Sequence, residues 1–238
     1  MNYSKEFEEL IENSIKKNQY VGLGNPNAKI LFIGKEAGVP IGTTITHGSA
    51  NSWKEKTNDY SKRFVPVEKN VRNHNHTWQK YEKVYNQIIA KLEKTKPKKE
   101  DYEITFVENV FTTELSNLVA PTTNEAKQLD GFKFELKKRK EHFWKSEFIQ
   151  KFPIVLITAT DNNYIETYEG EVCELFNVEY DKKIDCAKSD KMWIHYSKSK
   201  NPKLVIHTRQ LTNGASKELL DQISEVIADF INENSIKI

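Results

Sequence analysis

Short apolar runs alternate along this chain with longer amphipathic segments, and this alternation limits the possible folds more than any other feature. The apolar runs have the length and residue types of buried strands and occupy residues 28–33, 104–111, 153–158 and 202–207. The amphipathic segments repeat hydrophobic residues at helical spacing and occupy residues 1–20, 77–94, 132–148, 161–176 and 216–231. Strands that alternate with helices form parallel β-α-β units. The sequence therefore predicts an α/β fold, a three-layer α/β/α sandwich around a central, mainly parallel sheet of about four strands.

Three finer features complete the expected secondary structure. Residues 192–196 have the composition of a short edge strand. The basic run 137–140 lies in a loosely periodic helix and is expected to face outward. Asp161 is a suitable N-cap for the helix that it precedes.

The length and composition of the chain suit a single domain. It has 238 residues, of which 37% are hydrophobic and 29% charged, so we expect one core within residues 1–238. Residues 1–20 are expected to form an N-terminal helix and residues 39–76 a polar, basic insertion loop. No apolar run approaches the roughly 20 residues of a transmembrane helix, and the N-terminus lacks the apolar centre of a secretory signal. We therefore expect a soluble, cytoplasmic protein.

Cysteine usage argues against the common metal centres. The two cysteines, Cys173 and Cys186, are too few for a disulfide framework, a four-cysteine zinc site or a four-cysteine iron–sulfur cluster. We expect free thiols, no metal site and no cofactor.

The net charge of +2 conceals a strongly basic segment. Residues 53–99 contain thirteen Lys and Arg against five Asp and Glu, a local excess of eight positive charges. Such a segment can hold a phosphate backbone, and Lys62, Arg63 and Arg72 are its candidate DNA-binding residues. The alternative is a solvated helix face. Trp53 is an aromatic residue at the start of this segment that could contact a base.

Polar residues follow each predicted strand, where ligands bind in parallel sheets. Glu36, in the turn Gly34-Lys35-Glu36-Ala37-Gly38, could orient water beside a closely approaching backbone, or could cap a helix or pair with a surface lysine. Asn109 could read the edge of a base, or bond to nearby backbone. His207 could stabilise a departing anion, or be a core histidine.

The order of these motifs resembles the uracil-DNA glycosylase superfamily. The similar features are the Gly-x-Glu-x-Gly turn after the first strand, an Asn at the end of the second, and a His-x-x-x-Leu loop after the fourth. The acid of the first motif is displaced by one position from that of related branches. Thr-Arg-Gln stands between His207 and Leu211, where the family has Pro-Ser-Pro.

The resemblance implies a fold and a function. Members of the family have a three-layer α/β/α fold with a four-stranded parallel sheet, and they flip a base into a pocket at the strand ends. It implies that the backbone around Gly34 and Lys35 and the side chain of Asn109 contact the base. An aromatic residue stacks on the base in the family, and the candidates here are His47 and Trp53.

The sequence thus favours a DNA base glycosylase that hydrolyses the N-glycosidic bond of a flipped uracil-like or modified base, with DNA as partner. Glu36 would position water and His207 would stabilise the base anion. Arg209, Gln210 and Leu211 would contact DNA, Leu211 as a wedge in the base stack unless it packs on the last helix. The alternatives are a non-catalytic nucleic-acid or nucleotide-binding module, and a small-molecule hydrolase that uses the same pocket.

Overall fold

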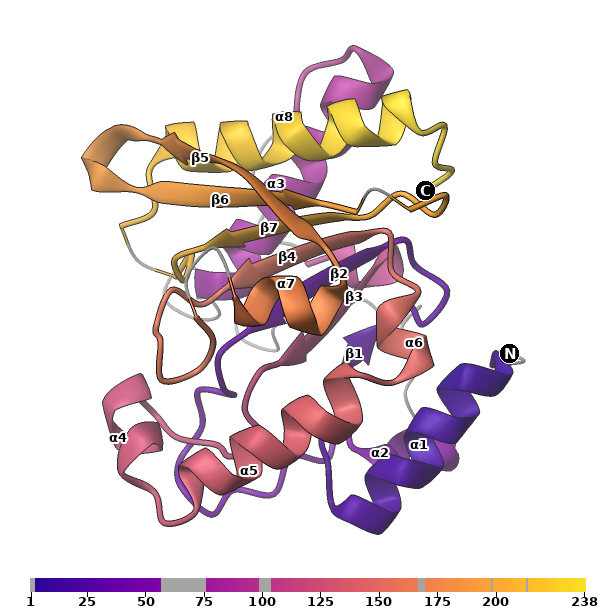
Figure 1. The fold of residues 1–238 in the computed structure, drawn as a ribbon, viewed down its shortest axis with the longest axis vertical. Coiled ribbons are helices and arrows are strands. Elements are labelled where there is room, and N and C mark those ends of the chain that lie inside the picture. The colour runs from indigo at the N-terminus through magenta and orange to yellow at the C-terminus, as the bar shows by residue number, and fades with distance from the viewer. Residues whose placement is uncertain (1–2, 57–75, 99–103, 167–169, 198, 213) are drawn as a thin grey trace.

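The computed structural model describes residues 3–56, 76–98, 104–166, 170–197, 199–212 and 214–238. Its strands form one seven-stranded sheet in the order β1-β3-β2-β4-β7-β6-β5 (Figure 1). The strands are β1 (Leu23–Gly24), β2 (Ile30–Gly34), β3 (Val110–Glu114), β4 (Ile154–Thr158), β5 (Glu179–Asp185), β6 (Lys191–Tyr196) and β7 (Leu204–Thr208).

The predicted α/β class is confirmed, and the sheet is larger and more mixed than predicted. Four central strands, β3, β2, β4 and β7, run parallel, as the alternation of strands and helices indicates. Antiparallel strands extend both sides: β1 pairs with β3, and the β5–β6 hairpin joins β7. β6 was predicted as an edge strand, but β5 pairs with its outer edge and is itself the last strand of the sheet. β5 is mostly exposed and charged, so it has no apolar run that could reveal it.

The second predicted strand, 104–111, lies too early in the chain. Residues Phe106–Glu108 form a 3-10 turn, η2, and β3 runs from Val110 to Glu114. Phe106, Val107 and Val110 are all buried. Burial of the turn against the sheet explains why its sequence is as apolar as that of a strand.

The main helices lie near their predicted positions, although two are interrupted. The helices are α1 (Lys5–Lys17), α2 (Ala50–Lys54), α3 (His76–Glu93), α4 (Thr123–Gln128), α5 (Phe132–Arg139), α6 (Glu147–Gln150), α7 (Glu171–Phe176) and α8 (Lys217–Glu233). The predicted helix 132–148 is divided by a π-helical turn, η3 (Lys140–Trp144), and a break before α6. In the predicted helix 161–176, the Asp161 carboxylate accepts a hydrogen bond from the Asn163 backbone N–H and so stabilises a turn. The helix α7 begins only after Gly170.

The core divides into two clusters on opposite faces of the sheet, because alternate residues of each strand belong to different clusters. In β2, Leu31 and Ile33 face one cluster, and Ile30 and Phe32 face the other. Helices α1, α5, α6 and α7 cover the first face, and α3 and α8 cover the second (Figure 1).

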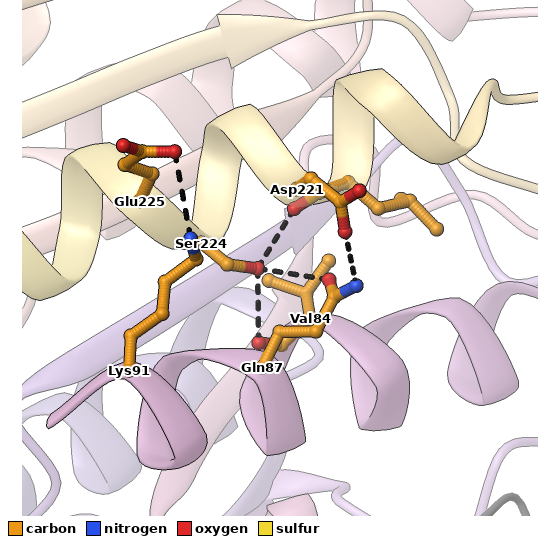
Figure 2. Close-up of polar contacts among 7 residues, drawn as sticks. Val84, Gln87, Lys91, Asp221, Ser224 and Glu225 are labelled. Atoms are coloured by element: carbon orange, nitrogen blue, oxygen red, sulfur yellow. Dashed lines mark hydrogen bonds and ion pairs between the residues drawn. The ribbon is translucent and has the colours of Figure 1, made fainter. Parts of the chain in front are cut away.

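Polar contacts also join α3 to α8 (Figure 2). The buried hydroxyl of Ser224 lies 3.2 Å from the Val84 carbonyl oxygen and 3.1 Å from Gln87 Oε1, and the Gln87 amide donates to Asp221. These bonds fix the position of α8, whose N-terminus follows the loop after β7. Among the described residues, none of the helices is both long enough and apolar enough to span a membrane.

Candidate functional site

A cavity of about 730 Å³ opens at the carboxyl ends of the parallel strands. Residues after β2, at the ends of β3 and β4, and in the loop after β7 all reach its wall. Six residues that the sequence analysis singled out line it: Gly34, Lys35, Glu36, His47, Arg209 and Gln210. The prediction that the strand ends form a pocket is therefore consistent with the geometry.

Glu36 projects a partly unsatisfied carboxylate into this cavity. Its Oε1 accepts a hydrogen bond of 2.9 Å from Thr123 Oγ1. Its Oε2 is buried without a hydrogen bond of normal geometry to any described residue, and so is the hydroxyl of Tyr164. Burial, followed by the neighbouring Glu36, raises the pKa of Tyr164. Buried oxygens normally have partners. The Tyr164 hydroxyl and the Glu36 carboxylate are neighbours, so each is the nearest available partner of the other, and a water or a polar ligand atom would compete for the same positions.

Glu114 provides a second carboxyl group, which the sequence analysis missed. It is the last residue of β3, and the parallel register pairs it with Gly34 at the end of β2. A Cβ at position 34 would lie only 2.0 Å from Glu114 Oε2, so a side chain there would displace the Glu114 carboxyl group from its present position. Burial and the charge of Glu36 raise the pKa of Glu114 to about 8, against the opposing effect of Arg139. Glu114 is therefore mainly protonated at neutral pH.

Arg139 secures the backbone behind these two carboxyl groups. It was predicted to face outward within the run 137–140, but it is fully buried. Its guanidinium donates to the carbonyl oxygens of Glu114 (2.9 Å) and Tyr20 (2.8 Å), to Gln19 Oε1 (3.2 Å) and to Thr113 Oγ1 (3.0 Å). Four oxygen acceptors compensate for burial of the charge, which explains how a basic residue can face the core here.

His207 does not line the cavity. It lies within β7, is fully buried, and its Nε2 bonds to the Ala159 carbonyl oxygen. Its Nδ1 is buried and has no hydrogen-bond partner in the described part of the chain. Burial lowers its pKa to about 4. The core-histidine interpretation fits this environment, and the geometry does not support the predicted contact with a leaving group.

Asn109 lies at the wrong end of its strand for the predicted contact with a base. It precedes β3 and is exposed, whereas the cavity is at the other end, beside Glu114. The error follows from the displaced strand boundary. Placing the strand over Phe111, Thr112 and Thr113, which are apolar or β-branched, would have made Glu114 the candidate residue.

Two further predicted contacts are also core residues. Trp53 lies on α2, within the predicted insertion loop, and is fully buried, with its Nε1 donating to the Gly22 carbonyl oxygen at 2.8 Å. Leu211 is fully buried in the same cluster as Leu219 and Leu220 of α8. The burial of these side chains does not support the wedge and base-stacking interpretations and favours a core role for both. Both segments look like polar loops in sequence, but isolated apolar residues anchor them to the core.

The predicted phosphate contacts Lys62, Arg63 and Arg72 lie outside the described residues. Of the aromatic candidates, exposed His47 reaches the cavity wall. Trp78, on α3, also lines the cavity. It belongs to the amphipathic segment 77–94, whose helical spacing predicts core packing.

The fold and the site together define an α/β protein with a polar cavity at the ends of its parallel strands, lined by two carboxyl groups and two cations. No protein-family model, curated protein or solved structure matches the chain. Across the described ranges, no three His, Cys, Asp or Glu residues are grouped as a metal site requires. The chemistry of the cavity therefore has to be inferred from its own side chains.

Proposed function

We propose that the chain hydrolyses the N-glycosidic bond of a uracil-like or modified base in DNA, and that the cavity at the strand ends holds the base and its sugar. In this interpretation the helices on the two faces are the outer layers of a three-layer α/β/α sandwich. The observation that carries the proposal is the pair of carboxyl groups, one with an unsatisfied oxygen and one protonated, in one polar cavity.

The two carboxyl groups suit the two proton transfers that hydrolysis requires. Glu36 accepts a proton from water as the water oxygen bonds to the anomeric carbon of the sugar. The C–N bond breaks, and Glu114 donates its proton to the departing base. Glu114 thus takes the role first considered for His207. Glu36 then releases the proton that it accepted, and Glu114 takes up a proton, so both groups return to their initial state. The products are the free base and an abasic sugar.

The position of Leu211 affects which DNA is the better substrate. A buried leucine cannot fill the gap that a flipped base leaves in a duplex. We therefore expect single-stranded DNA to be a better substrate than paired duplex, because its bases are already accessible. The same observation favours, as a second candidate, a hydrolase of free nucleosides or nucleotides.

The test is release of base. The protein is incubated with single-stranded and duplex oligonucleotides that carry uracil, hypoxanthine or modified cytosines, and with the corresponding nucleosides and nucleotides. Abasic sites or free bases are then measured. Release from oligonucleotides supports the proposal, and release from small molecules alone supports the second candidate. DNA binding without release from any substrate would support the non-catalytic alternative.

Glu114→Gln and Glu36→Gln should each slow single-turnover base release by roughly 10²-fold. Gln is close in shape to the protonated Glu114, so that variant should fold normally. The wild-type rate should fall as pH rises through about 8, where Glu114 loses its proton. The matched control is Glu12→Gln, on the exposed face of α1. Full activity of both cavity variants would contradict the assignment.

A further inference from the structure

A second cleft of about 490 Å³ adjoins the cavity at the strand ends. The two share Lys35, Arg209 and Gln210 in their walls, so a ligand in the cavity can extend into the cleft. The far wall of the cleft is the turn between β5 and β6. No feature of the proposed hydrolysis uses this cleft.

The cleft is strongly cationic. Lys35, Lys188, Lys191 and Arg209 line it, against a single acid, Asp190. Asp190 already has partners: its carboxylate accepts hydrogen bonds from Arg209 Nη1 at 3.0 Å and from the Ser216 backbone N–H at 2.7 Å. Because these bonds occupy the acid, the lysine ammonium groups dominate the charge that a ligand meets.

The turn that carries Lys188 and Lys191 is held in a defined conformation. Lys188 and Ser189 have positive φ angles of 58° and 61°. The Cys186 N–H donates to the Asp190 carbonyl oxygen at 2.8 Å, and Thr208 Oγ1 donates to the Lys191 carbonyl oxygen at 2.7 Å. These bonds tie the turn to itself and to β7. The backbone of the two lysines is thus preorganised, which lowers the entropic cost of binding an anion.

The cleft also contains an aromatic surface. Trp193, on β6, is half-buried and lines the cleft beside the lysines. Cationic groups beside an aromatic side chain are characteristic of grooves that bind single-stranded nucleic acid, where the cations meet the phosphates. An inorganic anion would contact only the cations of the cleft and not Trp193.

We propose that this cleft is a phosphate subsite, which binds a phosphate attached to the nucleoside whose base occupies the neighbouring cavity. This inference rests on the proposed function, and it narrows the substrate class to phosphate esters. The phosphate can be the terminal monoester of a nucleotide or a diester within a DNA strand. Lys188 and Lys191 bind it directly, and Arg209, positioned by Asp190, completes the site.

Binding can be measured without hydrolysis, so the inference and the proposed function can fail separately. Calorimetry of the full chain uses four probes: thymidine, thymidine 5′-monophosphate, an oligothymidylate without terminal phosphate, and inorganic phosphate. We expect both phosphate-bearing thymidine probes to bind more tightly than thymidine, and more tightly than inorganic phosphate, which contacts only the cations. Tighter binding of the monophosphate indicates a nucleotide, and tighter binding of the oligonucleotide indicates a diester.

The variant Lys188→Gln/Lys191→Gln should weaken binding of the preferred phosphate ester by about 10-fold and leave thymidine unaffected. The matched control is Lys182→Gln/Lys183→Gln, on β5 of the same hairpin, whose lysines do not line the cleft. Equal weakening by both variants would indicate only general attraction of charge and would overturn the subsite. Binding of the esters no tighter than thymidine would also overturn it, whatever the result of the base-release assay.

Discussion

At the scale of single residues, His207 shows how surroundings decide between chemistry and structure. The same imidazole at a strand end could serve either purpose. Here Nε2 bonds to the Ala159 carbonyl oxygen, and the ring of Trp193 lies 5.9 Å away between centroids. Burial lowers the pKa of His207 to about 4 from an ordinary value of 6.5. The neutral ring is part of the sheet, and we expect its loss to affect stability more than base release.

This environment predicts a pH-dependent stability. Because the folded-state pKa of His207 is lowered, its contribution is fully present above pH 6.5 and is lost as pH falls toward 4. Wild-type protein should therefore lose on the order of 3 kcal/mol of unfolding free energy over this range that a His207→Leu variant does not lose. Urea unfolding at several pH values measures the difference. Identical pH dependence in the two proteins would contradict the prediction.

At the scale of elements, the loop after β7 joins the site to the packing of α8. Arg209 and Gln210 reach the cavity, while the next residue, Leu211, is fully buried. Ser216 then caps α8 by accepting a hydrogen bond of 3.1 Å from the Leu219 backbone N–H. One short connection thus has a polar side toward the ligand and an apolar anchor in the core.

Leu211→Ala should lower the free energy of unfolding by about 2–5 kcal/mol, because it creates a cavity in the core. Activity per folded molecule on single strands and on duplex should change by the same factor. Ile41→Ala is the control, since Ile41 is 55% exposed and its truncation should cost less than about 0.5 kcal/mol. A selective loss of duplex activity with unchanged melting would restore the wedge interpretation.

At the scale of the whole molecule, the distribution of charge matters more than its sum. The net charge is +2, yet charge is unevenly placed around the site: the cavity holds two carboxyl groups beside Lys35 and Arg209, and the adjoining cleft adds Lys188 and Lys191 to these same two cations. A neutral base and an anionic phosphate would meet complementary surroundings in these two places. The basic segment 53–99 adds a third charged region, of which residues 57–75 and 99 lie outside the described ranges.

Neutralising Lys62, Arg63, Lys69 and Arg72 together should weaken binding to single-stranded DNA. The slope of log affinity against log salt should flatten by up to about 3, since each lost phosphate contact removes about 0.7. Binding titrations over a range of salt concentrations measure both quantities.

The control for this variant removes four exposed lysines from other segments: Lys5, Lys16, Lys137 and Lys145. It has the same net charge and should retain most of the affinity and slope. Equal effects of the two variants, or no effect of either, would show that the basic segment does not contact the DNA backbone.

The sequence by itself determined the α/β class, three of the four parallel strands and the main helices. It also placed Glu36 and the loop after β7 at strand ends. These features follow from local patterns, because an apolar run or an amphipathic repeat reports burial of its own segment. The start of the last helix near residue 216 was predictable for the same reason, and the structure begins α8 at Lys217.

Only the tertiary structure decided which side chains meet in the site. Glu114 faces Glu36 because β3 pairs with β2 in a register that joins residues about 80 positions apart. Arg139 is buried because four oxygens from distant segments converge on it. Trp53 and Leu211 are buried because helix α2 and the loop after β7 pack against the core. Each outcome depends on contacts between remote segments, and a local pattern of residue types does not contain that information.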